Sequence, residues 1–154
     1  MGVKIFFRNK NIYKGEEIAD ICVLSSKKLN SIKCPTHLNS SAIDEFLVIF
    51  LVAAKAKGIS YFRDIAELNT KESPRLKLAS KILKMMGVRN ILTKDSIKIF
   101  GNPKLIIDRK IVIKNFYKDH RIFMTSVIAA LTFGGRWIIH NLSLIHISEP
   151  TRPI

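Results

Sequence analysis

The sequence is poor in the features that mark secreted, metal-binding and membrane-spanning proteins. Its two cysteines, Cys22 and Cys34, lack the spacing and the histidine neighbours of a zinc site, and two are too few for a disulfide framework in a chain of 154 residues. The longest apolar run, Phe46 to Ala54, is flanked by charges and is too short to span a bilayer. We therefore expect a cytoplasmic protein in which this run is a buried helix.

No targeting segment is visible at the start of the sequence. Met1-Gly2 opens like a myristoylation signal, but Phe6 stands where that signal needs Ser or Thr. No basic stretch followed by an apolar leader comes after it. We expect neither a lipid anchor nor a membrane partner.

Acidic residues are scarce as well. The 12 Asp and Glu residues face 26 Lys and Arg residues, a formal net charge of +14 that would attract phosphates, nucleic acid or acidic membrane surfaces. A non-catalytic basic module that binds RNA is therefore one alternative, although no aromatic-bearing strand motif of an RNA-recognition domain accompanies the charge. Lys, Ile and Asn scattered along every segment also fit an AT-rich coding sequence without a selected basic face.

Length and hydrophobic periodicity predict one α/β domain, or part of one. With 47% hydrophobic and 25% charged residues, no segment is polar enough to be disordered. The patterns predict the order ββαβαβββαβ. The expected strands cover residues 3–8, 18–24, 59–64, 88–92, 97–100, 111–113 and 137–140, with a polar turn over 9–15, and the expected helices cover 42–57, 74–86 and 120–133.

Charged residues gather where the expected helices begin. Ser40 or Ser41 would cap the first helix, with Asp44 and Glu45 in its first turn. Carboxylates suit that position through the helix dipole alone, which gives Asp44 a structural explanation as well as a functional one.

The second and third helices each begin with an arginine. Ser73-Pro74 predicts an N-cap followed by a proline at the first helical position, which puts Arg75 in the first turn. Asp119 is the expected N-cap of the last helix, with Arg121 behind it. A cation is mildly disfavoured at a helix start, so a bound anion would explain these arginines better than the helix itself does. Each of them alone could equally be a solvated surface residue.

Taken in order, Asp44-Glu45, Lys71-Glu72-Ser73-x-Arg75 and Asp119-His120-Arg121 resemble the motifs of the 5-enolpyruvylshikimate-3-phosphate synthase family. The resemblance covers nearly all of residues 1–141, including Arg63-Asp64-Ile65-Ala66-Glu67-Leu68 and Gly87-Val88. It implies the enolpyruvyl transferase fold, of which this chain would be part of the second domain, built from repeated βαβαββ units. It also implies transfer of the enolpyruvyl group of phosphoenolpyruvate to the 5-hydroxyl of shikimate 3-phosphate, in the route to chorismate and the aromatic amino acids.

The resemblance also implies a role for each matching residue. Asp44 would orient and deprotonate the 5-hydroxyl, Lys71 would contact the phosphorylated shikimate and help move protons, and Glu72 would protonate the methylene carbon of phosphoenolpyruvate. Arg75 and Arg121 would hold the carboxylate of phosphoenolpyruvate. His120 would be either a direct participant or a structural, hydrogen-bonded histidine. We expect a full-length enzyme that is a monomer, uses no metal or organic cofactor and does not bind nucleic acid.

The chain departs from the family pattern in three places. Pro74 stands where the family has Asp, which removes an acidic neighbour of Arg75. The first domain and the final lysine-bearing segment of the family have no counterpart, so we expect the chain by itself to be inactive. Residues 142–154 do not resemble the family and read like a translated sequencing adapter, which would end the natural sequence at about residue 141. A relative that acts on a UDP-sugar is an alternative for the parent enzyme, although the paired motifs argue against it.

Overall fold

The computed structural model describes residues 1–114 and 119–140, and it contains the predicted elements in the predicted order. A short helix α1 (Asn39–Ala42) and two 3-10 turns, Thr36–Leu38 and Ala66–Asn69, were not predicted. The long helices are α2 (Phe46–Lys55), α3 (Arg75–Met85) and α4 (His120–Phe133). The strands are β1 (Lys4–Tyr13), β2 (Glu16–Leu24), β3 (Gly58–Phe62), β4 (Asn90–Leu92), β5 (Ile97–Gly101), β6 (Lys110–Ile113) and β7 (Arg136–Ile139).

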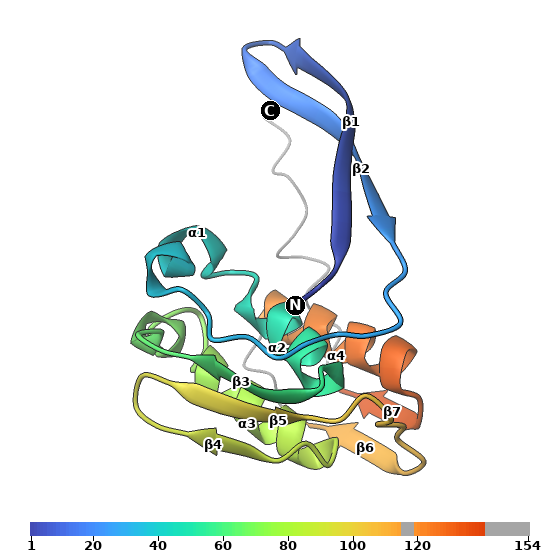
Figure 1. Cartoon of the computed structure of the whole chain (residues 1–154). Coiled ribbons are helices and arrows are strands. Elements are labelled where there is room, and N and C mark those ends of the chain that lie inside the picture. The colour runs from blue at the N-terminus through green and yellow to red at the C-terminus, as the bar shows by residue number, and fades with distance from the viewer. Residues whose placement is uncertain (115–118, 141–154) are drawn as a thin grey trace, which may run out of the picture.

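The strands form three separate sheets, and α2, α3 and α4 pack together beside them (Figure 1). Strands β3, β5 and β4 make an antiparallel sheet in that order, while β6 and β7 pair in parallel. The parallel pair needs a long crossover, which α4 supplies. The N-termini of α2, α3 and α4 come close to one another through this packing.

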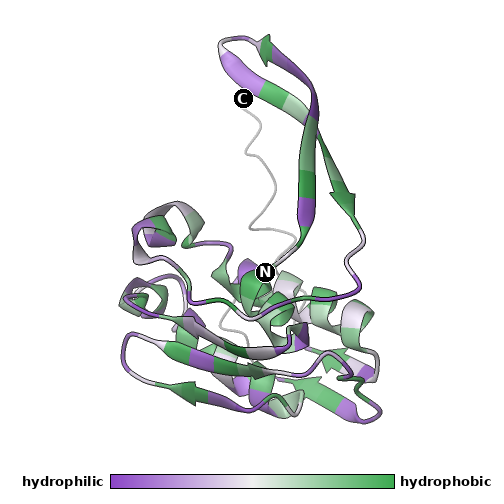
Figure 2. Cartoon of the chain, in the orientation of Figure 1, coloured by the Kyte–Doolittle hydropathy of each residue, from purple (hydrophilic) through white to green (hydrophobic). Residues whose placement is uncertain are grey.

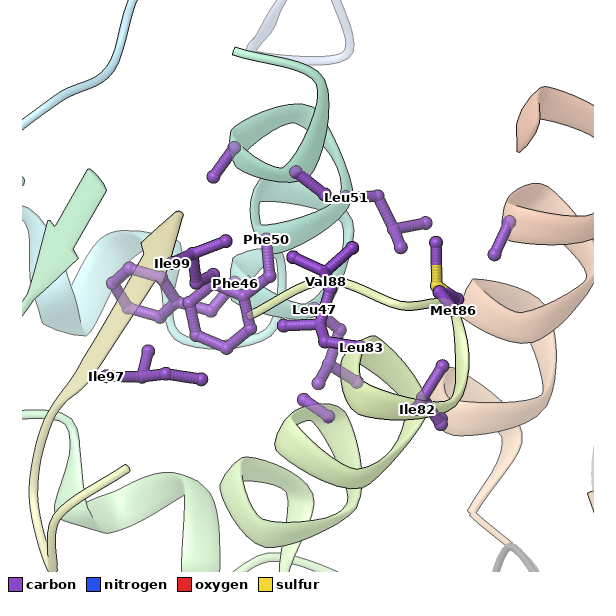
Figure 3. Packing of buried hydrophobic residues seen from close by; sticks show 14 of the residues in the cluster. Phe46, Leu47, Phe50, Leu51, Ile82, Leu83, Met86, Val88, Ile97 and Ile99 are labelled. Carbon is purple, nitrogen blue, oxygen red and sulfur yellow. The ribbon is translucent and has the colours of Figure 1, made fainter. Parts of the chain in front are cut away.

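The apolar run of α2 is buried, as predicted, between β5 and the other two long helices (Figure 3). The rings of Phe46, Phe50 and Phe62 lie 5.0–5.9 Å apart between centroids in stacked and edge-on contacts. Each fully buried side chain of this size contributes about 1.5–3 kcal/mol to stability. Around them pack further buried side chains of the core, from α3, β5, β6, α4 and the segment after α3, among them Leu76, Ile82, Leu83, Met86, Val88, Ile97, Ile99, Ile111, Ile122 and Phe133. In the described part of the chain, no helix has the length and apolarity needed to cross a membrane.

The first two strands form a hairpin that extends away from the rest of the molecule and carries both apolar and polar side chains (Figure 2). We expected a polar turn over residues 9–15, but β1 continues to Tyr13 and the turn is only Lys14-Gly15. Both turn residues have positive φ, 50° and 87°, the conformation that matches the twist of two paired strands. A register shift between Arg8 and Asn11 lets the strand pass through the polar segment.

The predicted start of the first long helix was wrong. Ser40 and Ser41 lie inside α1 and do not cap α2, and the chain turns at residues 43–45 before α2 begins at Phe46. Asp44 and Glu45 therefore precede the helix instead of lying in its first turn. From this turn, the Asp44 carboxylate forms ion pairs with arginines of α3 and α4.

The predicted N-cap of α3 was wrong as well, although Arg75 does lie in the first turn of the helix, as predicted. Pro74 occupies the N-cap position without a side-chain cap, and Arg75 is the first helical residue. The Ser73 hydroxyl donates instead to a carboxylate 46 residues away, that of Asp119. By contrast, Asp119 caps α4 as predicted, because its side chain accepts from the backbone N–H groups of Arg121 and Ile122.

Several strand and helix ends differ from the prediction by one to a few residues. The strand expected to reach Asp64 ends at Phe62, and Asp64 itself has a φ of 58°, which a strand does not allow. Helix α2 ends at Lys55, and Gly58 begins β3 instead of closing the helix. Strand β4 begins at Asn90, two residues after the expected start at Val88.

Candidate active site

Arg75 is the centre of a charge cluster at the joined N-termini of α2, α3 and α4. Its guanidinium is only 1% exposed because three carboxylates surround it. Nε donates to Asp119 and Nη1 to Asp44, both at 2.8 Å, while Nη2 donates to Glu72. Burial disfavours the charge, but the hydrogen bond and the negative charge of Asp119 hold the pKa of Arg75 above its ordinary value. The cluster therefore keeps a fully charged arginine in a fixed orientation.

Asp119 is the fully buried member of this cluster. Its carboxylate is 0% exposed and accepts four hydrogen bonds, from Ser73 Oγ at 2.6 Å, Arg75 Nε at 2.8 Å and the N–H groups of Arg121 and Ile122 at 3.0 and 3.4 Å. Burial alone would raise the pKa of Asp119, but the hydrogen bonds from Arg75 and Ser73 lower it below its ordinary value. Asp119 thus ties the start of α3 to the start of α4.

Arg121 lies on the more open side of the cluster, with 31% of its side chain exposed. Its Nη2 is 3.4 Å from the carboxylate of Asp44, and Nη1 donates to the backbone oxygen of Asp44 at 3.2 Å. Glu45 is a weaker neighbour, with Oε1 3.7 Å from Nη1. One carboxylate, that of Asp44, therefore contacts both arginines.

The remaining predicted residues border the cluster. Glu72 is 58% exposed, so one face of its carboxylate is open while the other contacts Arg75. Lys71 pairs with Glu67 at 2.8 Å, and this hydrogen bond is the main reason why the pKa of Lys71 is raised. The first residue of α4, His120, has an exposed side chain.

The structure brings together Asp44, Glu72, Arg75 and Arg121, which come from three separate stretches of the sequence, each at or next to the start of a long helix. Lys71 is adjacent, but its ammonium group contacts Glu67 and not the arginines. Sequence reasoning missed the roles of Ser73 and Asp119 inside the cluster. Both were assigned only as helix caps, and no local signal indicates that a hydroxyl would bond to a carboxylate so far along the chain.

Comparisons with known proteins match nearly the whole chain to one family. The family model described as EPSP synthase (3-phosphoshikimate 1-carboxyvinyltransferase) matches residues 9–151. A 3-phosphoshikimate 1-carboxyvinyltransferase of Ruthia magnifica subsp. Calyptogena magnifica is 37% identical over 135 residues, which are 85% of this chain and 29% of that protein. The protein of the same name from Thermosynechococcus vestitus is 36% identical over 150 residues, or 97% of this chain and 33% of that protein.

A solved structure agrees with the sequence matches. EPSP synthase from Acinetobacter baumannii superposes with a TM-score of 0.85 at 35% identity, over 98% of this chain and 35% of that one. The predicted mixed α/β fold of an enolpyruvyl transferase is thereby confirmed.

The family match continues past residue 141, where we expected a foreign tail to begin. Residues 141–154 lie outside the described part of the structure, so this boundary stays a prediction. The chain spans about a third of the length of the relatives that it matches. By sequence, by fold and by the family model, the chain belongs to the EPSP synthase family.

Proposed function

We propose that the parent of this chain transfers the enolpyruvyl group of phosphoenolpyruvate to the 5-hydroxyl of shikimate 3-phosphate. The observation that carries the proposal is the meeting of Asp44, Glu72, Arg75 and Arg121 at one place, in a chain of the EPSP synthase family. Because the chain spans about a third of its relatives, it would supply only part of the site and be inactive alone.

The residues present suit the chemistry of each step. The Asp44 carboxylate would take the proton of the 5-hydroxyl while that oxygen bonds to C2 of phosphoenolpyruvate. Glu72, with an open face, would give a proton to the methylene carbon, which produces a tetrahedral intermediate. Loss of a proton from the new methyl group then restores the double bond and expels phosphate. Lys71, beside these carboxylates, would contact the phosphorylated acceptor.

The two arginines would hold the carboxylate of phosphoenolpyruvate. A guanidinium can bind a carboxylate with two parallel N–H groups, which fixes both position and orientation. Arg121 is partly exposed and can receive a ligand, and Arg75 is held in place from behind by Asp119. His120, exposed beside Arg121, would be close enough to the same ligand to contribute a proton or a hydrogen bond.

Other parts of the assignment are proposals of the same kind. We propose that residues 1–141 are a piece of the second domain and that residues 142–154 are foreign to it. We also propose that the full-length enzyme is a cytoplasmic monomer that acts without a metal or an organic cofactor. Small-molecule substrates, and not nucleic acid or membranes, would be its ligands.

A chimaera tests the proposed function. This chain would replace the matching third of the Acinetobacter baumannii EPSP synthase, and phosphate release would be measured with both substrates. We expect activity that requires both phosphoenolpyruvate and shikimate 3-phosphate. Glu72→Gln should lower kcat by about a hundredfold or more, as loss of a general acid does. Glu16→Gln, an equal charge change at the hairpin turn, should leave kcat unchanged.

The outcomes of this experiment separate the alternatives. Activity with a UDP-sugar in place of shikimate 3-phosphate would support the related enolpyruvyl transferase instead. A folded chimaera that releases no phosphate with either acceptor contradicts the proposal.

A further inference from the structure

The carboxylate of Asp44 already occupies the space between the two arginines. Oδ1 accepts from Nη1 of Arg75 at 2.8 Å, and Oδ2 lies 3.4 Å from Nη2 of Arg121. One carboxylate thus bridges guanidinium groups that belong to α3 and α4. A ligand carboxylate held by the same two arginines would have to place its oxygens at these positions.

We infer that Asp44 is an internal substitute for the ligand carboxylate, and that an anion binds to Arg75 and Arg121 only by displacing it. This inference rests on the proposed function and adds a consequence to it. While Asp44 pairs with the two arginines, the proposed base is held in ion pairs. Arrival of phosphoenolpyruvate would release Asp44 at the moment when a second substrate needs a base.

The contacts of Asp44 allow such a displacement, and those of Asp119 do not. Asp44 lies in the turn before α2 and its side chain is 39% exposed, whereas Asp119 is 0% exposed and accepts four hydrogen bonds. Exposed ion pairs are weak, but breaking a buried pair is costly. Arg75 would therefore keep its bond to Asp119 and its orientation while Asp44 leaves.

Charge balance makes displacement more favourable than simple addition. Arg75 already contacts three carboxylates, and Arg121 lies near that of Glu45 as well as that of Asp44. A further anion added to this set would lie next to several like charges. If the anion instead replaces Asp44 between the arginines, the number of negative groups next to the arginines does not change. The Asp44 side chain can then turn toward solvent.

The test compares phosphoenolpyruvate binding to the chimaera described above and to two of its variants of equal charge. Asp44→Asn removes the proposed competitor, and Glu45→Gln removes the adjacent charge, which touches Arg121 only at 3.7 Å and does not touch Arg75. We expect Asp44→Asn to bind phosphoenolpyruvate about fivefold more tightly than the unchanged protein. This factor corresponds to about 1 kcal/mol, the upper limit for an exposed ion pair. Glu45→Gln should change the affinity less than about twofold, because its contact is longer.

A second measurement needs no variant. In the unchanged chimaera, the carboxyl carbon signal of Asp44 should move during the titration together with the side-chain N–H signals of Arg121, while the signal of Asp119 stays in place. An Asp44 signal that stays fixed as the Arg121 signals move would overturn the inference.

The binding results separate this inference from the function on which it rests. Equal gains for the two variants would show a general effect of removed charge and overturn the inference, and so would weaker binding to Asp44→Asn. Failure of all three proteins to bind phosphoenolpyruvate would contradict the arginine clamp itself, and the inference with it.

Discussion

Asparagine in place of Asp119 should destabilise the chain far more than asparagine in place of Asp44. Both carboxylates accept a hydrogen bond from Arg75 at the same distance, 2.8 Å. They differ in burial, since Asp119 is 0% exposed and Asp44 is 39% exposed. The pair of variants therefore compares a buried and a half-exposed partner of the same arginine, although Asp119 also accepts bonds from Ser73 and two backbone N–H groups.

The magnitudes follow from that difference. Breaking a buried ion pair costs about 3–5 kcal/mol. Arg75 keeps Asp44 and Glu72 as partners in Asp119→Asn, so the loss should lie at the lower end of that range. Asparagine is as good an N-cap as aspartate, so the start of α4 keeps its cap and contributes little to the loss. We expect about 3 kcal/mol or more for Asp119→Asn, and less than about 1 kcal/mol for Asp44→Asn, whose ion pairs are screened by water. The larger value is a substantial part of the stability of a typical domain, about 5–15 kcal/mol.

Urea unfolding followed by circular dichroism measures both free energies of unfolding. Equal losses for the two variants would refute the reasoning, because burial would then have no influence on the strength of the pair. A loss below about 1 kcal/mol for Asp119→Asn would show that the buried arginine tolerates a neutral partner, contrary to the cost expected for a buried charge.

Three further predictions concern pH, packing and the substituted proline. Because the pKa of Asp119 in the folded chain lies below its ordinary value of 3.8, the ionised carboxylate stabilises the fold above pH 3.8, and this stabilisation is lost as the pH falls through the lower folded-state pKa. Urea midpoints measured from about pH 6 to about pH 2 should show this loss. In Asp119→Asn, the part of the pH dependence that is due to Asp119 should be absent. Gly101→Ala should lower the free energy of unfolding in urea by about 3 kcal/mol, because the added carbon would clash with backbone oxygens at the end of α2. In Gly15→Ala the added carbon meets no atom, so the variant should lose only about 1 kcal/mol, through the positive φ of this position. Equal losses for the two variants would contradict this prediction. In the chimaera, Pro74→Asp should lower the Michaelis constant for phosphoenolpyruvate if the missing carboxylate near Arg75 affects positioning, and an unchanged constant would show that the proline has no such effect.

Local patterns were enough to predict the order of the elements and the buried helix. The apolar run predicted a buried helix, and most of its side chains are buried in α2. The cap of α4 at Asp119 was also predictable, because the Asp119 side chain and the backbone N–H groups that it accepts from are only two or three residues apart in the sequence. A turn between the first two strands was predicted, but its two-residue length was not, because Lys14 is an uncommon residue at a position with positive φ.

The start of α2 did not follow the local preference, and the partners of Asp44 lie far along the chain. The carboxylate of Asp44 would suit a first helical turn, yet it pairs with Arg75 and Arg121 from the turn before the helix. Similarly, the hydroxyl of Ser73 would suit an N-cap but bonds to Asp119. For Ser73, the buried and charged partner offers more than a single exposed cap, which is worth about 1 kcal/mol. In both cases the partner lies far along the chain, where no local signal indicates it.

The sequence by itself determined the family, the element order and the identity of the charged residues at the helix starts, because these depend on residue type and spacing. Only the tertiary structure decided that Arg75 is buried among three carboxylates, that Asp119 joins two helix N-termini, and that Asp44 lies between two arginines. The physical reason is that burial and ion pairing depend on distances between segments far apart along the chain. Those distances arise only when the helices pack.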